Sequence, residues 1–184
     1  MHGKTVVEQV LSFWFEELSP ARWFNGGREL DEQIGSRFST VLRQAAAGEL
    51  EHWRTSAMGR LAEIIVLDQF SRNLYRDTAQ AFAQDGMALI LSQEAVRAGA
   101  LNGMDNAQQC SFLLMPYMHS ESRYIHQLAV PLFQRHASED SYRFELLHKG
   151  IIDRFGRYPH RNAALNREST AEELEFLQQP GSSF

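Results

Sequence analysis

The sequence predicts an all-α protein, a single domain of about eight helices over residues 1–184. Apolar residues recur at intervals of three and four along most of the chain, which is the spacing of one face of an α-helix. No stretch of four or more residues alternates between polar and apolar side chains, as a half-buried strand would. No linker or low-complexity tract divides the chain, and its length suits one domain.

The first four helices are expected at residues 6–18, 31–47, 56–70 and 78–98. Pro20 follows the first helix, Gly48 closes the second and Gly99 closes the fourth. Proline cannot continue a helix, and glycine readily takes the left-handed conformation that ends one. The third helix is apolar around most of its circumference, so we expect it at the centre of the core.

The remaining helices are expected at residues 105–114, 120–135, 140–155 and 169–180. Pro116 is expected to stop the first of these, and Pro131 to kink or split the second. Ser169 and Thr170 each precede a glutamate by three residues, the capping-box pattern that starts a helix. Such helices pack most simply as antiparallel hairpins in a tetratricopeptide-like stack, although the signature of that repeat is not clean.

Charge and composition exclude several classes of protein. The chain has 18 Lys and Arg against 23 Asp and Glu, a net charge of −5, so it lacks the basic surplus of a nucleic-acid or anionic-membrane binder. Its one cysteine, Cys110, allows no internal disulfide and no multi-cysteine metal site. No signal peptide is visible at the N-terminus, and the longest apolar run, residues 112–118, is too short to span a bilayer. We therefore expect a cytoplasmic protein.

Three polar segments interrupt the amphipathic pattern, each at the end of a helix. The first, residues 68–73, follows the most apolar helix and contains Asp68, Arg72 and Asn73. Buried charges are costly unless they are paired. The simplest interpretation is therefore an ion-pair cluster that ties this helix to its neighbour, and the alternative is a ligand site.

The second polar segment, residues 116–122, contains His119 and Glu121. A serine at 120 or 122 can cap a helix, and a glutamate in the first turn suits the helix dipole. This structural role explains Glu121 but not His119. A histidine beside a carboxylate can transfer protons, because imidazole titrates near neutral pH.

The third polar segment follows the seventh helix at residues 155–162. Together with that helix it supplies His148, Arg157, His160, Arg161 and Asn162. A basic loop in an acidic protein suits a phosphate or carboxylate, since the planar fork of arginine binds such groups through two hydrogen bonds. Alternatively, Arg157 and Arg161 pair with Asp68 and Glu121, and both interpretations can hold together.

No spacing matches a complete cofactor or catalytic motif. His119 and Glu121 fit the His-x-Glu half of a zinc deaminase, but the Pro-Cys-x-x-Cys half is absent. The phosphate loop, the dinucleotide glycine fingerprint and the Gly-x-Ser-x-Gly elbow are also absent. A metal held by His119, Glu121, His148 and His160 would require the fold to gather them. We expect no metal and no cofactor.

Four stretches of the sequence resemble a largely bacterial family catalogued as domain of unknown function 924. They are VLSFWF at 10–15, LDQFSRN at 67–73, PYMHSE at 116–121 and RFGRYPHRN at 154–162. The resemblance extends over about residues 7–177 and implies an all-helical, tetratricopeptide-like fold without an established activity. Ser71, Ser122 and Asn166 stand where the family commonly has proline, aspartate and glycine, which leaves Glu121 as the carboxylate of the second segment.

Two functional hypotheses follow from these segments. The first is a pocket for a small phosphorylated or carboxylated metabolite, bound by the arginines and oriented by the asparagines. There His119 and His160 would transfer protons, with Glu121 and Asp68 setting their pKa values. Any reaction would be metal-independent acid–base chemistry such as hydrolysis or isomerisation.

The second hypothesis is a tetratricopeptide-like scaffold that binds a peptide or protein partner, with the polar segments as buried braces. Braces should have every charge paired and inaccessible to solvent. A pocket should leave the ends of the arginine and histidine side chains open.

Overall fold

Residues 3–183 are described by the computed structural model, and they form an all-α fold with no residue of this range in a β-strand. Residues 1, 2 and 184, which the predicted domain includes, lie outside this range. The first seven helices are α1 (Val6–Ser12), α2 (Pro20–Asn25), α3 (Gly27–Ala46), α4 (Ala57–Ile65), α5 (Ser71–Leu74), α6 (Asp85–Arg97) and α7 (Ala107–Met118). The later helices are α8 (Arg123–His136), α9 (Glu139–Phe155) and α10 (Ala171–Leu177).

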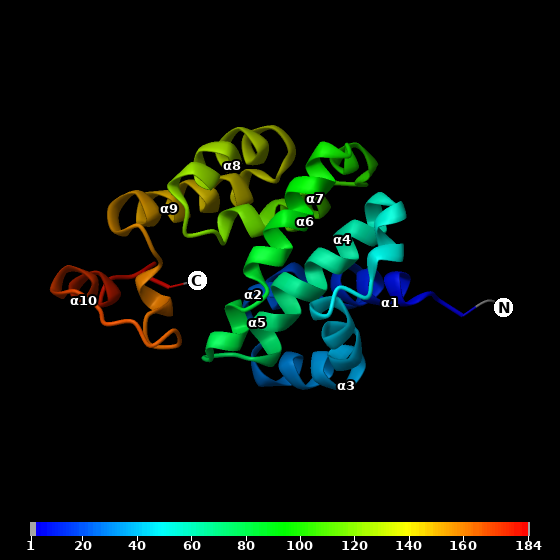
Figure 1. The fold of residues 1–184 in the computed structure, drawn as a ribbon, viewed down its shortest axis with the longest axis horizontal. Helices are drawn as coiled ribbons and strands as arrows, with labels where there is room; N and C mark the ends of the chain where they lie inside the picture. Colours follow the sequence, from blue (N-terminus) through cyan, green and yellow to red (C-terminus); the bar gives the residue numbers. More distant parts are fainter. Residues whose placement is uncertain (1–2, 184) are drawn as a thin grey trace.

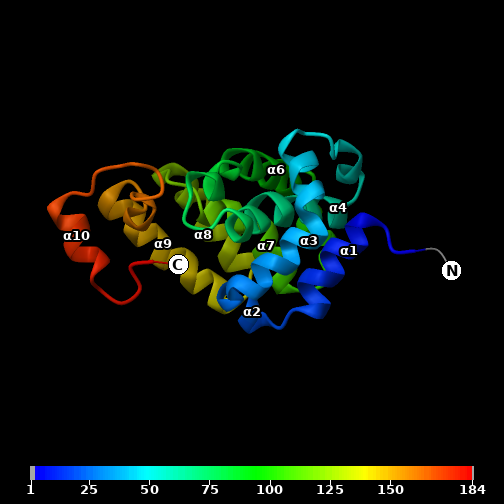
Figure 2. The same ribbon diagram turned by 90° about the horizontal axis from the view of Figure 1, so that it is seen from below.

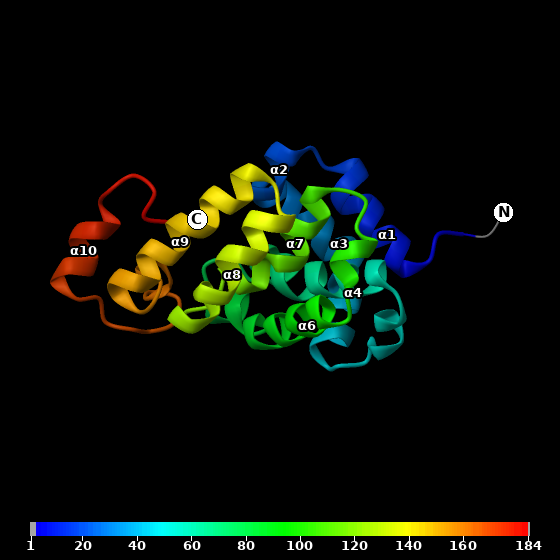
Figure 3. The same cartoon turned by 90° about the horizontal axis from the view of Figure 1, so that it is seen from above.

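The molecule is elongated, with α1 near one end and α10 at the other (Figures 1 and 2). Helices α1 to α7 form the larger part, and α8 and α9 lie beside it (Figure 3). After α10 the chain turns back toward α9 (Figures 2 and 3). None of the described helices is long and apolar enough to cross a lipid bilayer.

The short helix α2 was not predicted from the sequence. Pro20 is its first residue, a position where the missing N–H of proline has no intrahelical partner to lose. The preceding helix α1, which starts with a capping box between Thr5 and Glu8, has by then passed into a π-helical turn, Phe13–Glu17. Pro20 therefore separates two helices, as expected, and also begins the second of them.

The predicted third helix changes its hydrogen-bond spacing in its second half. Helix α4 gives way to a π-helix, Val66–Phe70, which leads directly into α5. A π-helix spaces its hydrogen bonds by five residues instead of four, and such turns are frequent at functional sites. All five of its residues are buried, including Asp68 and Gln69. The π-turn therefore carries a carboxylate and an amide into the core.

The helix boundary predicted at Pro116 is wrong. Helix α7 continues through this proline to Met118, although an interior proline costs roughly 3 kcal/mol. Residues 109–118 are all buried, so the burial of apolar surface on every side outweighs that cost. Helix α8 runs unbroken through Pro131, so of the two predicted alternatives, a kink or a split, the split is wrong.

The predicted helix 78–98 starts later than expected. A 3-10 turn, Ala79–Phe82, comes first, and α6 begins at Asp85. This residue therefore stands in the first turn of α6, where the partial positive charge of the helix N-terminus stabilises a carboxylate.

Aromatic side chains fill the centre of the larger part. Trp14 packs edge-to-face against Phe70 and Phe112, with ring centroids 5.7 and 5.5 Å away. The indole N–H of Trp23 donates to the carbonyl of Trp14 at 2.7 Å, which satisfies its polar edge. From Leu61 onward every side chain of α4 is buried, which confirms the prediction that this helix lies at the centre of the core.

Helices α7, α8 and α9 pack one against the next. A fully buried polar pair joins the last two, because Nδ1 of His126 lies 2.7 Å from Oε1 of Glu145. The Nε2–H of His126 donates to the carbonyl of Ser120 at 2.8 Å. Burial raises the pKa of Glu145.

Gly59→Ala is expected to destabilise the protein by about 1–3 kcal/mol, although alanine normally favours a helix. The added Cβ would lie 1.9 Å from the carbonyl oxygen of Trp53. This oxygen belongs to the backbone, so it cannot avoid the clash by a change of rotamer. Gly150→Ala in α9 is the control, because its Cβ would meet no atom within 4 Å, and it should stabilise by about 0.5–1 kcal/mol. Urea denaturation measures both changes, and a stabilised Gly59→Ala variant would contradict the close contact.

Candidate functional site

A cleft of about 300 Å³ opens where the start of α6, the end of α7 and the segment after α9 meet. It is lined by Phe82, Asp85, Gly86, Leu89, Pro116, His119, Ser120, Glu121, Arg161 and Leu165. Two of the three predicted polar segments therefore meet at this cleft. The remaining segment, residues 68–73, does not line the cleft, but Asp68 contacts His119 and Arg72 contacts Asp85.

His119 is held in the cleft by the buried carboxylate of Asp68, with 2.7 Å between Nδ1 and Oδ1. Asp68 also accepts hydrogen bonds from Arg72 and Gln69. Burial by itself raises the pKa of Asp68, but Arg72 and His119 outweigh it and hold the pKa well below its usual range. The ionised carboxylate fixes a proton on Nδ1 of His119 and leaves the lone pair on Nε2. Burial, together with Arg72, lowers the pKa of His119, so its imidazole is neutral at pH 7.

Asp85 joins two arginines at the edge of the cleft. Arg72 binds its carboxylate through two hydrogen bonds of 2.8 and 3.0 Å, and Arg161 donates a third at 3.2 Å. The sequence left open a pairing of Arg161 with Asp68 or Glu121. That pairing is wrong, because Asp85 is the partner of Arg161.

The guanidinium of Arg161 lies between two aromatic rings, those of Phe82 and Tyr158, at 4.6 Å from each centroid. It also donates to the carbonyl of His119 at 3.0 Å. Burial and the nearby Arg72 lower its pKa. Its Nε is buried and, among the described residues, has no hydrogen-bond acceptor.

Glu121 is held by an arginine that lies outside the predicted segments. Arg167 donates two hydrogen bonds of 2.7 and 2.8 Å to its carboxylate, and the backbone N–H of Tyr158 donates a third at 2.7 Å. Burial by itself raises the pKa of Glu121, but these three donors outweigh it and lower the pKa. Glu121 is therefore an anion with its position fixed.

Three of the candidate residues lie away from the cleft and tie helices together. Arg157 binds the carboxylate of Glu173 on α10 at 2.6 and 2.8 Å, not Asp68 or Glu121, so that predicted pairing is wrong as well. Asn162 donates to the same carboxylate at 3.3 Å. Asn73 donates to Asp31 of α3 at 2.8 Å.

His148 and His160 lie around the ring of Tyr158, each with its ring centroid 5.6 Å away. The His148 ring is also 6.5 Å from that of His119. Burial lowers the pKa of His148 to about 3. Burial, with two nearby arginines, lowers the pKa of His160 to about 4. Both imidazoles are therefore neutral at pH 7.

Sequence reasoning missed Asp85 and Arg167, which hold the ion pairs on the two sides of the cleft. Asp85 lies within residues 78–98, which were expected to be one helix, and Arg167 lies in a loop that contains no recognised motif. The sequence around each residue therefore did not mark it as a candidate for the site. Among residues 3–183 no group of three or more His, Cys, Asp or Glu side chains is arranged to hold a metal ion.

Comparisons place the chain among proteins whose activity is not established. The profile of the family described as bacterial protein of unknown function (DUF924) matches residues 10–181. A protein of unknown function from Agrobacterium tumefaciens has a similar structure, with a TM-score of 0.88 and 33% sequence identity over 94% of this chain and 97% of that one. No curated protein matches the sequence.

Proposed function

The chain belongs to the DUF924 family of bacterial proteins of unknown function, and we propose that its cleft binds a small carboxylate- or phosphate-bearing metabolite on which His119 acts as a general base. The observation that carries this proposal is the pairing of His119 with Asp68 at 2.7 Å. Asp68 directs the proton to Nδ1, and none of the described residues hydrogen-bonds to Nε2. A neutral histidine that lines a cleft and keeps this lone pair is suited to accept a proton. The imidazolium that forms is stabilised by the Asp68 carboxylate.

The affinity for an anion is supported by Arg161, which lines the cleft, and by Arg72, which binds the lining residue Asp85. Arg72 and Arg161 already bind one carboxylate, that of Asp85, in the geometry that arginine offers to carboxylates and phosphates. The Nε–H of Arg161 has no acceptor among the described residues. A ligand anion that enters the cleft would compete with Asp85 for the guanidinium of Arg161.

A scaffold for a peptide or protein partner is the second candidate function. It is favoured by the ion pairs of Arg157 with Glu173 and of Arg167 with Glu121, which fasten the segment after α9 to its neighbours as braces. Under this hypothesis the Asp85 ion pair is also a brace, and no small anion binds at the cleft.

Thermal shift with inorganic phosphate, citrate and phosphoenolpyruvate separates the two functions. An anion present at 100 times its dissociation constant should stabilise the protein by about 2.7 kcal/mol, which is roughly 5–10 °C for a chain of this length. Arg161→Lys keeps the charge but loses the planar fork, and it should weaken the binding at least tenfold. Arg143→Lys, at an exposed arginine, is the control and should bind like the wild type.

The absence of a shift with all three anions, together with a lower melting temperature of Arg161→Lys, would contradict the proposal and favour the scaffold. A shift that Arg161→Lys retains in full would place anion binding elsewhere on the protein.

A further inference from the structure

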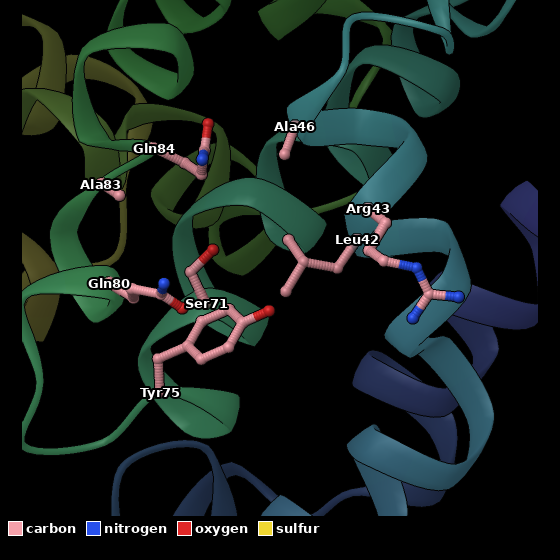
Figure 4. A pocket seen from close by; sticks show the side chains of 8 residues that line it. All are labelled: Leu42, Arg43, Ala46, Ser71, Tyr75, Gln80, Ala83 and Gln84. Carbon is pink, nitrogen blue, oxygen red and sulfur yellow. The ribbon is translucent and has the colours of Figure 1, made fainter.

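A second cavity, of about 200 Å³, lies between α3 and the chain from α5 to the start of α6. It shares no lining residue with the cleft. Leu42 and Ala46 of α3 form one wall, and Ser71, Tyr75, Gln80 and Gln84 line the other (Figure 4).

The hydroxyl of Ser71 points into this cavity (Figure 4). Ser71 is 1% exposed, and its Oγ has no hydrogen-bond partner among the described residues. A helical serine commonly bonds back to the carbonyl four residues earlier, but that bond is not made here. An unsatisfied buried hydroxyl costs roughly 1–3 kcal/mol. A ligand group in the cavity that bonds to Oγ removes this cost.

Apart from Arg43, the other polar groups of the cavity are uncharged. They are the phenol of Tyr75 and the amides of Gln80 and Gln84. None of the described lining residues is acidic. The one charged lining residue, Arg43, donates to the hydroxyl of Thr40 at 3.0 Å, and its guanidinium points away from the other lining side chains (Figure 4).

We propose that this cavity is a binding site for a small polyhydroxylated molecule without charge, of the size of a monosaccharide. Hydroxyl, phenol and amide groups each donate and accept hydrogen bonds, so they complement a ligand whose hydroxyl groups do the same. The apolar wall of Leu42 and Ala46 suits the C–H surface of such a ligand. A charged ligand would find no counter-ion directed into the cavity.

The test is NMR titration of the ¹⁵N-labelled protein with glucose, ribose and inositol. At least one of them should shift the amide signals of residues that line the cavity. Ser71→Ala should weaken that binding three- to tenfold, the value of one neutral hydrogen bond. Because the variant removes a hydroxyl that has no partner, its melting temperature should be equal to or above that of the wild type.

Two further variants test whether the shifts of the amide signals come from binding in the cavity. Ala46→Leu fills the cavity without removing a polar group, and it should abolish the binding. Ser36→Ala, at an exposed serine of the same helix α3, should bind like the wild type. The proposal is wrong if none of the three probes shifts these signals, if Ser71→Ala and Ala46→Leu bind as the wild type does, or if citrate or phosphate occupies the cavity instead.

Discussion

Lowering the pH from 6.5 to 5 is expected to remove about 3 kcal/mol of folding stability through two buried histidines. Burial lowers the pKa of His148 to about 3, and burial with nearby arginines lowers the pKa of His160 to about 4. In the unfolded chain both have a pKa near 6.5. Between these values the unfolded state binds more protons than the folded state, so stability falls as the pH falls. The lowered pKa of His119 acts in the same direction.

One buried carboxyl group opposes this effect. Burial raises the pKa of Glu145, so the folded state takes up a proton there before the unfolded state does. Stability from this group therefore increases as the pH falls, and the total slope is smaller than that of the histidines alone. Single substitutions of the histidines separate the two contributions.

Urea denaturation between pH 5 and 7.5 measures the free energy of unfolding for the wild type and for the variants His148→Gln and His160→Gln. Each substitution should reduce the slope by about 1.4 kcal/mol per pH unit at the acidic end of this range. His52→Gln, at an exposed histidine, should leave it unchanged. A slope that neither His148→Gln nor His160→Gln alters would mean that the buried histidines carry a proton in the folded protein.

The all-α class and the central position of α4 could be predicted because they depend on local periodicity. Residues 61, 62, 64 and 65 are apolar, and this local pattern predicts that the segment is surrounded by other helices; the buried Glu63 among them is paired with Arg54. The π-turn at Val66–Phe70 and the passage of α7 through Pro116 could not be predicted in this way. Both depend on packing against helices distant in the sequence, and that packing outweighs the local preference of the chain.

The polar segments that supply the candidate site could be predicted from the sequence, but the ion pairs between their side chains could not. His119 was singled out because no helix cap explains a histidine there, and the structure places it in the cleft. The choice of ionic partners could not be read from spacing. Arg161 pairs with Asp85, 76 residues earlier, and nothing in the local sequence of Asp85 distinguishes it from an ordinary acidic residue in the first turn of a helix. Long-range pairs of this kind are set by the tertiary fold.

Asp68→Asn is expected to destabilise the protein by about 3–5 kcal/mol, because it removes one partner of a buried ion pair. The carboxylate accepts hydrogen bonds from Arg72, His119 and Gln69 while it is only 1% exposed. Asparagine offers one oxygen and a donor in place of two acceptors, so at least one of these donors loses its acceptor. The charge of Arg72 is then balanced by Asp85 alone.

Thermal and urea denaturation measure this loss, which corresponds to a decrease in melting temperature of roughly 10 °C. Asp140→Asn is the control, because Asp140 pairs with Arg143 on the exposed surface, and the change there should be within about 1 kcal/mol. A decrease no larger than that of the control would contradict an ionised Asp68 in the core. Since the contribution of Asp68 comes from a lowered pKa, it should persist above pH 4 and disappear as the pH falls further.

The same variant tests how Asp68 acts on His119. Without the carboxylate, nothing fixes the proton on Nδ1, so the ¹⁵N signals of the imidazole should change from the Nδ1–H form toward a mixture of both neutral forms. The Asp68 carboxylate also raises the pKa of His119 against burial and Arg72, so its loss should lower that pKa further. If Asp68 only holds helices together, its loss should reduce the stability but should not change the tautomer of His119. An unchanged tautomer in a variant that still folds would therefore remove Asp68 from the proposed proton transfer and leave it a structural role alone.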